Sequence, residues 1–472
     1  MKRKSIYLYI AVLTIFFGIC SPLLFTHGMF MDGAIYAVIA KNMAMGKGTF
    51  WTPHFSETLL TVFYEHPPLA IWVESLFFRV MGTTILVERF YSVLCIVFTG
   101  FLIVKIWKEM TTETLTAWVP LLLFVSFPII TWTATNNMLE TTMSVFICTS
   151  VLLYLIGIRK KQYYFVILAG LSLFLGVLSK GIVAFFPWTL PLWIWLFLKK
   201  ISFKQVIRDT LSLVISTLIP LMLCYISDQE ATRFFDAYLS NQLFSSVTGL
   251  REVVESRFLI IKRLWDNMIP CLILITGLFI ALIAKKRINL LKEQIHNSLL
   301  FFVLSMCGIL PIMLSLKQSG FYIVPAYPFL AIAFALPFQP FIQKLMEKTN
   351  ESSKGFLIFK IVSCVLFLSV IVFAFSQKGK IGRDNVQLHV VFECNKYIPS
   401  NTTISIDEKT YSHWSMQSYF ARYKAITLDS HNAHPYYLHD KNVPFRLSEE
   451  DYIPLIEVEN FVLLEAVVLS GK

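Results

Sequence analysis

Apolar runs of about 17 to 22 residues recur along most of this 472-residue chain. An apolar helix of about 20 residues spans the hydrocarbon core of a bilayer, and a helix satisfies its own backbone hydrogen bonds there. The pattern therefore predicts a mainly α, polytopic membrane protein with about 11 transmembrane helices. The runs lie at 6–26, 86–107, 114–131, 138–158, 163–179, 182–198, 209–226, 267–284, 298–316, 321–340 and 356–376.

The composition excludes a water-soluble particle. Hydrophobic residues make up 56% of the chain and charged residues 15%, whereas a soluble protein has about 25% charged residues. The net charge of +11 is spread over short clusters between the apolar runs, so no nucleic-acid partner is predicted. Seven of the eight cysteines lie inside apolar runs and no C-x-x-C pair occurs, which gives no sign of a zinc ribbon or a disulfide framework.

The basic clusters predict the orientation of the chain. By the positive-inside rule, the loops that carry them are cytoplasmic. This places the N-terminus in the cytoplasm and predicts a multi-pass protein of the inner (plasma) membrane, with the first run kept as an uncleaved anchor. The six clusters are Lys2-Arg3-Lys4, Lys105 with Lys108, Arg159-Lys160-Lys161, Lys199-Lys200 with Lys204 and Arg208, Lys285-Lys286-Arg287, and Lys344 with Lys348 and Lys354.

Three longer polar segments then face outward, at 27–85, 227–266 and 377–472. Apolar residues at helical spacing in the first predict amphipathic helices lying along the membrane interface, with Trp51 and Trp72 at the level of the headgroups. The last segment predicts a small α/β domain, with a helix that ends before Pro399 and strands at 402–406 and 461–469. We therefore expect a transmembrane module over 1–376 and a soluble periplasmic domain over 377–472, which either gates entry of an acceptor or acts as a spacer.

Lone polar residues collect at the outer ends of the predicted helices. The orientation was assigned from inner basic clusters, so their common outward position is an independent observation. It fits a catalytic site at one membrane surface, because a transport path would place polar residues at mid-depth, in broken helices of paired halves. The residues are Asp32, Glu65, His66, Asn136, Asn137, Glu140, Lys180, Lys317 and Tyr322.

Four motifs resemble those of GT-C glycosyltransferases, above all the bacterial lipid A aminoarabinose transferases and the protein O-mannosyltransferases. The resemblance covers roughly residues 1–340. It implies the GT-C fold and a sugar donor linked to a polyprenyl phosphate such as undecaprenyl phosphate. It further implies inverting transfer to a lipid, glycan or protein on the periplasmic face, as in lipid A modification and cell-envelope glycosylation. The motifs are Met31-Asp32-Gly33-Ala34-Ile35-Tyr36, Tyr64-Glu65-His66-Pro67-Pro68-Leu69, Ser179-Lys180-Gly181 and Lys317 with Tyr322-Ile323-Val324-Pro325-Ala326-Tyr327-Pro328.

By this resemblance Asp32 is the general base, Tyr36 belongs to the same motif, and Glu140 orients the acceptor or the sugar. Attack on the anomeric carbon with inversion needs one carboxylate on the nucleophile's side. Asp32 follows an apolar run and opens a predicted helix, whose dipole favours the ionised form. The alternatives are that Asp32 is simply a helix N-cap and that Glu140 caps its helix together with Asn137.

The departing phosphate calls for cationic or hydrogen-bonding groups. The aminoarabinose transferases usually have Lys after the Glu of the second motif, whereas this chain has His66. Snorkelling of the two lysines to the interface and solvation of the two loop arginines are the alternatives to phosphate binding. The candidate donor-binding residues are Tyr36, Glu65, His66, Lys180, Arg251, Arg257, Lys317 and Tyr322.

Glu65 and His66 could also contribute to a divalent metal site. Two neighbouring side chains do not make a set of four ligands, so these two residues alone do not predict a bound cofactor. Two other functions stay open. One is a flippase or transporter of a polyprenyl-linked sugar, and the other is a non-catalytic GT-C-like subunit in which Asp32 and the outer loop form a docking surface.

Overall fold

The computed structural model describes residues 3–244, 256–445 and 452–467. The chain forms two compact units. The first contains Met1–Pro22, Tyr64–Ala70 and Arg89–Ser376, and the second contains Leu23–Phe63, Ile71–Glu88 and Gln377–Lys472. Ser376 is the last residue of the first unit, and Gln377 begins the last part of the second. The second unit, however, also includes most of the predicted first outer loop.

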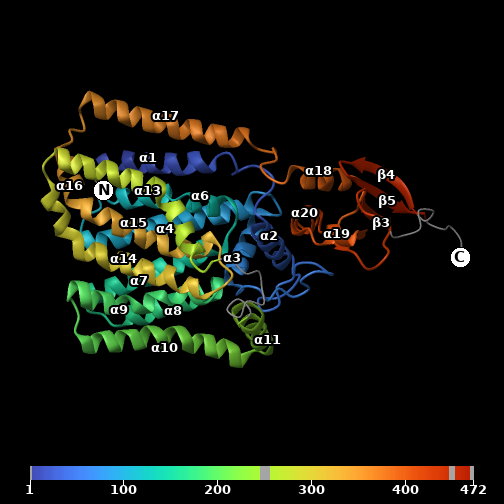
Figure 1. Ribbon diagram of the computed structural model, residues 1–472, viewed down its shortest axis with the longest axis horizontal. Coiled ribbons are helices and arrows are strands. Elements are labelled where there is room, and N and C mark those ends of the chain that lie inside the picture. The colour runs from blue at the N-terminus through green and yellow to red at the C-terminus, as the bar shows by residue number, and fades with distance from the viewer. Residues whose placement is uncertain (1–2, 245–255, 446–451, 468–472) are drawn as a thin grey trace. The chain divides into compact units, whose positions relative to one another are not determined.

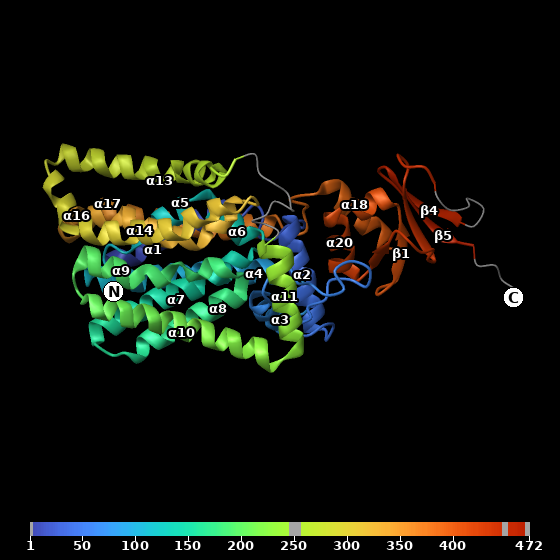
Figure 2. The ribbon, with the colours of Figure 1, turned by 60° about the horizontal axis from the view of Figure 1, so that its bottom comes forward.

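The first unit is helical, and Figures 1 and 2 show most of its helices running side by side in one bundle. In chain order its elements are α1 (Arg3–Cys20), α4 (Val87–Thr111), α5 (Trp118–Ser126), α6 (Pro128–Thr135), α7 (Leu139–Lys160), α8 (Tyr164–Lys180), η1 (Ile182–Thr189), α9 (Leu190–Trp193), η2 (Ile194–Leu198), α10 (Phe203–Ser227), α11 (Gln229–Tyr238), η3 (Leu239–Phe244), α13 (Leu259–Ala284), η4 (Ile288–Gln294), α14 (Ile295–Ile309), η5 (Leu310–Leu314), η6 (Gly320–Ala326), α15 (Tyr327–Ala335), η7 (Leu336–Phe338), α16 (Gln339–Lys348) and α17 (Lys354–Ser376).

A polytopic membrane protein is confirmed by the lengths and hydropathies of these helices. Within the described ranges, seven helices are long and apolar enough to cross a membrane, or eight if one bent pair forms a single span. Three shorter apolar helices, Lys4–Cys20, Tyr164–Lys180 and Ile182–Leu198, cover the remaining predicted runs. Each predicted run is therefore helical, and membrane crossing by the three shorter ones stays a prediction.

Several helix bounds differ from the predicted ones, and two of these differences have clear local causes. The run at 114–131 is divided into α5 and α6, which are bent by 75°. Phe127, between them, is extended because Pro128 disfavours helical backbone in the residue before it. The predicted span at 267–284 begins earlier, at Leu259, so part of the predicted second outer loop is helix. The charged residues Lys262, Arg263 and Asp266 hid this extension in the sequence.

Burial separates inner from outer helices in the first unit. Most residues of Gly320–Lys348 are buried, whereas few residues of α10, α13 and α17 are. Apolar side chains such as Ile273 and Val372 remain exposed on the outer helices. A helix that is apolar all round belongs in a core or in lipid, so these exposed faces are the ones that lipid would cover.

The second unit contains the predicted α/β domain, which is confirmed. Its mixed sheet has the order β2-β1-β3-β5-β4, with β1 parallel to β2 and β3, and with β5 antiparallel to β3 and β4. Helices α18 and α20 pack on one side of the sheet (Figure 2). The elements are α2 (Met31–Ala44), α3 (Leu69–Met81), which begins in the first unit, α18 (Asn385–Cys394), β1 (Thr403–Ile406), α19 (Glu408–Tyr411), α20 (Trp414–Lys424), β2 (Thr427–Asp429), β3 (Tyr436–Asp440), β4 (Tyr452–Val458) and β5 (Phe461–Ala466).

Helix α2 corrects the prediction of an amphipathic interfacial helix, because all of its residues from Gly33 to Met43 are buried. Even its polar residues are internal and satisfied. Lys41 donates to backbone carbonyls of α20, and Asn42 donates to the carbonyls of His54 and Phe55 at 3.1 and 2.8 Å. Helical spacing of apolar residues indicated the helix, but it carried no information about what covers the opposite face.

Candidate functional site

In the first unit, Glu140 and Lys180 form a buried ion pair. Lys180 Nζ lies 2.7 Å from Glu140 Oε1, and the side chains are 7% and 0% exposed. Glu140 is in the first turn of α7, where Met138 rather than Asn137 is the N-cap, and Lys180 ends α8. The structure therefore places Glu140 and Lys180 together in the interior of the first unit.

Aromatic rings surround the ammonium group of this pair. Lys180 Nζ lies 5.3 Å from the ring centroid of Phe321 and 5.5 Å from that of Tyr322, both in η6. The ring of Trp132, from α6, stacks on Phe321 with the centroids 5.8 Å apart. The structure thus brings together three of the predicted residues, Glu140, Lys180 and Tyr322, in surroundings where charge–charge and cation–π interactions are strong.

The turn after Lys180 explains the Ser179-Lys180-Gly181 motif. Gly181 has φ +106°, and a Cβ atom at this position would lie 2.0 Å from the hydroxyl oxygen of Tyr238. Only glycine permits both this backbone conformation and this approach. Tyr238, at the end of α11, was missed in the sequence because nothing near it marks a contact with a turn about 60 residues earlier.

Arg257 and Lys317 are joined through a residue that the sequence interpretation also missed. Gln318 is buried; its Oε1 accepts from the Ile260 amide at 2.9 Å, and its Nε2 donates to the carbonyls of Arg257 and Ser315, each at 3.0 Å. The Arg257 side chain is exposed and Lys317 is half-buried. The side chain of Gln318 therefore holds the backbone at Arg257 next to the backbone at 315–318, close to Lys317. Arg251 lies outside the described residues.

Glu65 and His66 lie in the short part of the first unit that leads into α3. Both are half-buried, and Pro67 and Pro68, which follow them, are buried directly before the helix begins. The ring of Tyr64 meets that of Phe234 edge-on, with the centroids 5.7 Å apart. The described ranges contain no group of three or more His, Cys, Asp or Glu arranged to hold a metal ion. A metal contact through Glu65 and His66 stays a prediction.

Asp32 and Tyr36 lie in the second unit. Helix α2 begins at Met31 with Phe30 as its N-cap, so Asp32 occupies the first turn and is not the cap. Its half-buried carboxylate therefore lies near the positive end of the helix dipole, which favours the ionised form. Tyr36, one turn later, is buried and packs edge-on against Phe63, with the ring centroids 6.3 Å apart.

Lys41, in the last turn of α2, is a buried cation of the second unit whose protonation is perturbed. Burial, together with the positive charges of Arg422 and Lys47, lowers the pKa of Lys41 to about 7. Its ammonium group donates to the carbonyls of Ala421 and Arg422 at 2.6 and 2.9 Å, in the last turn of α20. The sequence does not mark Lys41 as a buried residue, because a lone lysine on a predicted interfacial helix is expected to be solvated.

We expect the stability of the protein to rise with pH through this lysine. Its ordinary pKa of 10.5 describes the unfolded chain, which therefore binds more protons than the folded chain between about pH 7 and 10.5. The free energy of unfolding should increase across that window by at most about 1.4 kcal/mol per pH unit, and this contribution should be flat below pH 7. Thermal unfolding of the wild type and of Lys41→Met from pH 6 to 10 measures it. If the melting temperatures of the wild type and Lys41→Met changed with pH by the same amount, the lowered pKa of Lys41 would be contradicted.

Comparison with known proteins identifies a family related to part of the chain. Residues 65–225 match the family model PMT_2, described as dolichyl-phosphate-mannose-protein mannosyltransferase. This range includes Glu65, His66, Glu140 and Lys180. It does not include Asp32, Arg257 or Lys317.

Two curated relatives align with about 40% of the chain. An uncharacterised protein of Aquifex aeolicus (strain VF5) is 30% identical over 186 residues, which are 39% of this chain and 36% of the relative. The undecaprenyl phosphate-alpha-4-amino-4-deoxy-L-arabinose arabinosyl transferase of Wigglesworthia glossinidia brevipalpis is 24% identical over 181 residues, which are 37% of this chain and 31% of the relative. The chain thus spans about a third of the length of these relatives.

Solved structures extend the likeness to the whole chain. ArnT from Cupriavidus metallidurans bound to undecaprenyl phosphate superposes with a TM-score of 0.68 at 12% identity, covering 99% of both chains. Its apo state gives 0.64 at 13% identity, covering 99% of this chain and 98% of ArnT. The apo oligosaccharyltransferase of Archaeoglobus fulgidus gives 0.51 at 11% identity, covering 89% of this chain and 64% of that protein.

The fold is therefore that of the GT-C glycosyltransferases, in a multi-pass membrane protein. The predicted GT-C fold is confirmed by the likeness to ArnT, and the resemblance to the PMT_2 family is confirmed over residues 65–225.

Proposed function

We propose that this chain is an integral-membrane glycosyltransferase that moves a hexosyl or pentosyl group from a polyprenyl phosphate to a lipid, glycan or protein acceptor. The observation that supports this most is the ArnT fold, which extends over 99% of both chains and belongs to a protein crystallised with undecaprenyl phosphate. Proteins with one fold can have many activities, so the assignment also rests on Asp32 in the second unit and on the candidate phosphate-binding cations in the first.

In the proposed reaction, Asp32 accepts the proton of an acceptor hydroxyl or amine as its oxygen or nitrogen attacks the anomeric carbon. The bond between that carbon and the phosphate oxygen breaks, and the polyprenyl phosphate leaves with the bonding electrons. Attack opposite the leaving group inverts the configuration and needs only one base. The position of Asp32 in the first turn of α2 supports this role, because the helix dipole there favours the ionised carboxylate that can accept a proton.

For the leaving phosphate, the contacts favour Arg257 and Lys317 over Lys180. The charge of Lys180 is already balanced by Glu140 at 2.7 Å, so a phosphate would have to compete with a buried carboxylate. Arg257 is exposed and Lys317 half-buried, and Gln318 ties their backbones into one segment. We assign binding of the phosphate to these two cations, with His66 as a further hydrogen-bond donor. We assign Glu140, Lys180 and Tyr322 to the lining of the site, where they set its shape and charge.

We further propose that Asp32, the phosphate-binding cations and the 377–472 domain are periplasmic, in a bacterial inner membrane. The helix bounds support this orientation. Helix α7 runs from Glu140 to the basic cluster at 159–161, and α8 returns from that cluster to Lys180. Candidate residues and basic clusters thus lie at opposite ends of the same helices, as the positive-inside rule requires for an outer site.

The test is a reconstituted assay with a polyprenyl-phosphate sugar and a panel of acceptors. A transferase releases free polyprenyl phosphate and forms a glycosylated product, both of which mass spectrometry detects. A flippase would move the intact donor to the other leaflet, and a non-catalytic subunit would do neither. Transbilayer movement of donor without release of polyprenyl phosphate would contradict the proposal.

A further inference from the structure

The 377–472 domain and the segment that carries Asp32 share one hydrophobic core. Met29, at 6% exposure, and Ala34, at 3%, belong to a cluster whose other buried members all come from the domain. Among those members are Leu388 of α18 and Phe420 of α20. Two residues that flank Asp32 in the sequence are therefore packed as part of the domain.

Tyr419 of α20 binds the backbone directly before α2. Its hydroxyl oxygen accepts from the Met29 amide at 3.1 Å and lies 2.6 Å from an Asp384 carboxylate oxygen and 3.1 Å from the Met29 carbonyl. Because a hydroxyl has one proton, the shorter, charge-assisted bond to Asp384 takes it. Asp384 thereby orients the hydroxyl oxygen toward an amide only three residues before Asp32.

The backbone just before Met29 is also fixed. The His27 amide donates to the Lys380 carbonyl at 2.8 Å, and the Gly382 amide donates to the His27 carbonyl at 2.9 Å. Gly28 has φ +84°, and a Cβ atom there would lie 2.3 Å from the Arg383 carbonyl oxygen. His27 is thus hydrogen-bonded through both its amide and its carbonyl to residues 380–382, and Gly28 packs against Arg383.

The far end of α2 is bound to the same helix. Lys41 donates to the carbonyls of Ala421 and Arg422, which close the last turn of α20, and a cation at that end is favoured by the helix dipole. Since Met29 and Lys41 bind residues 419–422, α2 is attached to α20 at both ends. Two attachments three turns apart fix the axis of a helix as well as its position.

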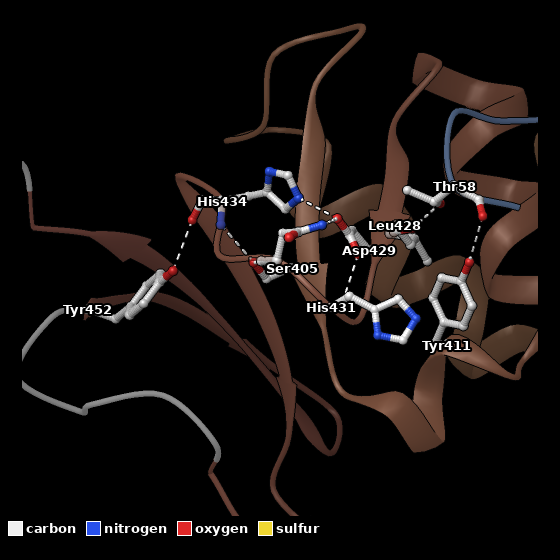
Figure 3. A network of polar contacts seen from close by, with 9 residues as sticks. Thr58, Ser405, Tyr411, Leu428, Asp429, His431, His434 and Tyr452 are labelled. Atoms are coloured by element: carbon white, nitrogen blue, oxygen red, sulfur yellow. Dashed lines mark hydrogen bonds and ion pairs between the residues drawn. The ribbon is translucent and has the colours of Figure 1, made fainter.

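Four more hydrogen bonds tie residues 58, 84 and 88 to the domain. Arg422 Nη2 donates to Glu88 at 2.9 Å and to the Thr84 carbonyl at 2.7 Å. The Thr58 hydroxyl donates to the Leu428 carbonyl at 2.6 Å, and the Tyr411 hydroxyl donates to the Thr58 carbonyl at 3.1 Å (Figure 3). Beside Leu428, Asp429 accepts from the His431 amide and faces His434 Nε2, both at 2.8 Å, and this fixes the end of β2.

From these contacts we infer that the 377–472 domain positions Asp32, with Tyr419 and Lys41 as the positioning residues, and is neither a separate gate nor a spacer. The inference rests on the proposed role of Asp32 as base. A general base must lie within hydrogen-bond reach of the proton it accepts, and a displacement of about 1 Å can lower a rate about a hundredfold. Loosening the start of α2 should therefore lower turnover and leave donor binding unchanged.

Tyr419→Phe tests this, because it removes the hydroxyl and keeps the packed ring. We expect kcat to fall about ten- to a hundredfold with the KM for the donor unchanged. In the full-length protein, hydrogen–deuterium exchange of the segment 27–34 should become faster. The matched control is Tyr452→Phe, which removes a hydroxyl that donates to the His434 carbonyl at 3.0 Å within the domain. It should change neither kcat nor exchange at 27–34.

The two measurements separate this inference from the proposed function. Wild-type kcat in Tyr419→Phe, with or without a lower melting temperature, would overturn the positioning role. Equal losses of kcat in Tyr419→Phe and Tyr452→Phe would also overturn it, because a general effect of the domain would then suffice. If the wild type released no polyprenyl phosphate, the proposed function itself would fail. Exchange at 27–34 would still report whether Tyr419 holds the start of α2, since it needs no turnover.

Discussion

Asp32→Asn is expected to abolish sugar transfer while leaving the protein folded and in the membrane. The amide is nearly isosteric with the carboxylate, so the start of α2 and its attachments to α20 should persist. It cannot accept a proton at neutral pH, and loss of a general base lowers a rate by about 10²- to 10⁴-fold. The measurement is release of polyprenyl phosphate by the purified variant in liposomes, together with its melting temperature.

A matched control distinguishes a base from a residue that only supports a helix. Asp228 is the N-cap of α11 and accepts from the Glu230 amide at 2.8 Å. Asn is as good an N-cap as Asp, so Asp228→Asn should retain both stability and transfer. Retained transfer in Asp32→Asn would remove Asp32 as the base, whatever the control shows.

The sequence predicted the helices well because bilayer thickness leaves few choices for a long apolar run. The prediction that the candidate residues face outward uses the same rule, since charges are excluded from the hydrocarbon core. The misplaced bounds have local causes. The start of α13 carries Lys262, Arg263 and Asp266, and the bend between α5 and α6 depends on one proline.

The pairing of candidate residues could not be predicted, because it depends on packing between distant segments. Glu140 and Lys180 are 40 residues apart. A single charged residue at the end of a membrane helix is common, so neither residue alone indicates a partner. The acceptors for Lys41 are backbone carbonyls 380 residues later. Every residue has a carbonyl, so the sequence offers no signal for such a bond. The inclusion of residues 23–63 in the unit of the C-terminal domain was missed for this reason.

Breaking the Glu140–Lys180 pair should destabilise the first unit strongly. Lys180→Met would leave the Glu140 carboxylate, which is 0% exposed, without its cation. Removal of one partner from a buried pair typically lowers the free energy of unfolding by about 3–5 kcal/mol. We expect a clear loss of thermal stability in detergent for Lys180→Met and for Glu140→Gln. The exposed pair Arg159–Glu109, at 2.6 Å, is the control, and Arg159→Met should have a much smaller effect.

The double variant Glu140→Leu/Lys180→Met decides what the pair is for. Replacing a buried ion pair by apolar side chains of similar volume is often neutral for stability, so the double variant should regain most of what each single variant loses. A stable double variant that transfers sugar at the wild-type rate would make the pair purely structural. A stable but inactive one would mean that the ion pair beside Phe321 and Tyr322 acts in the reaction. Single variants as stable as the wild type would contradict the buried pair itself.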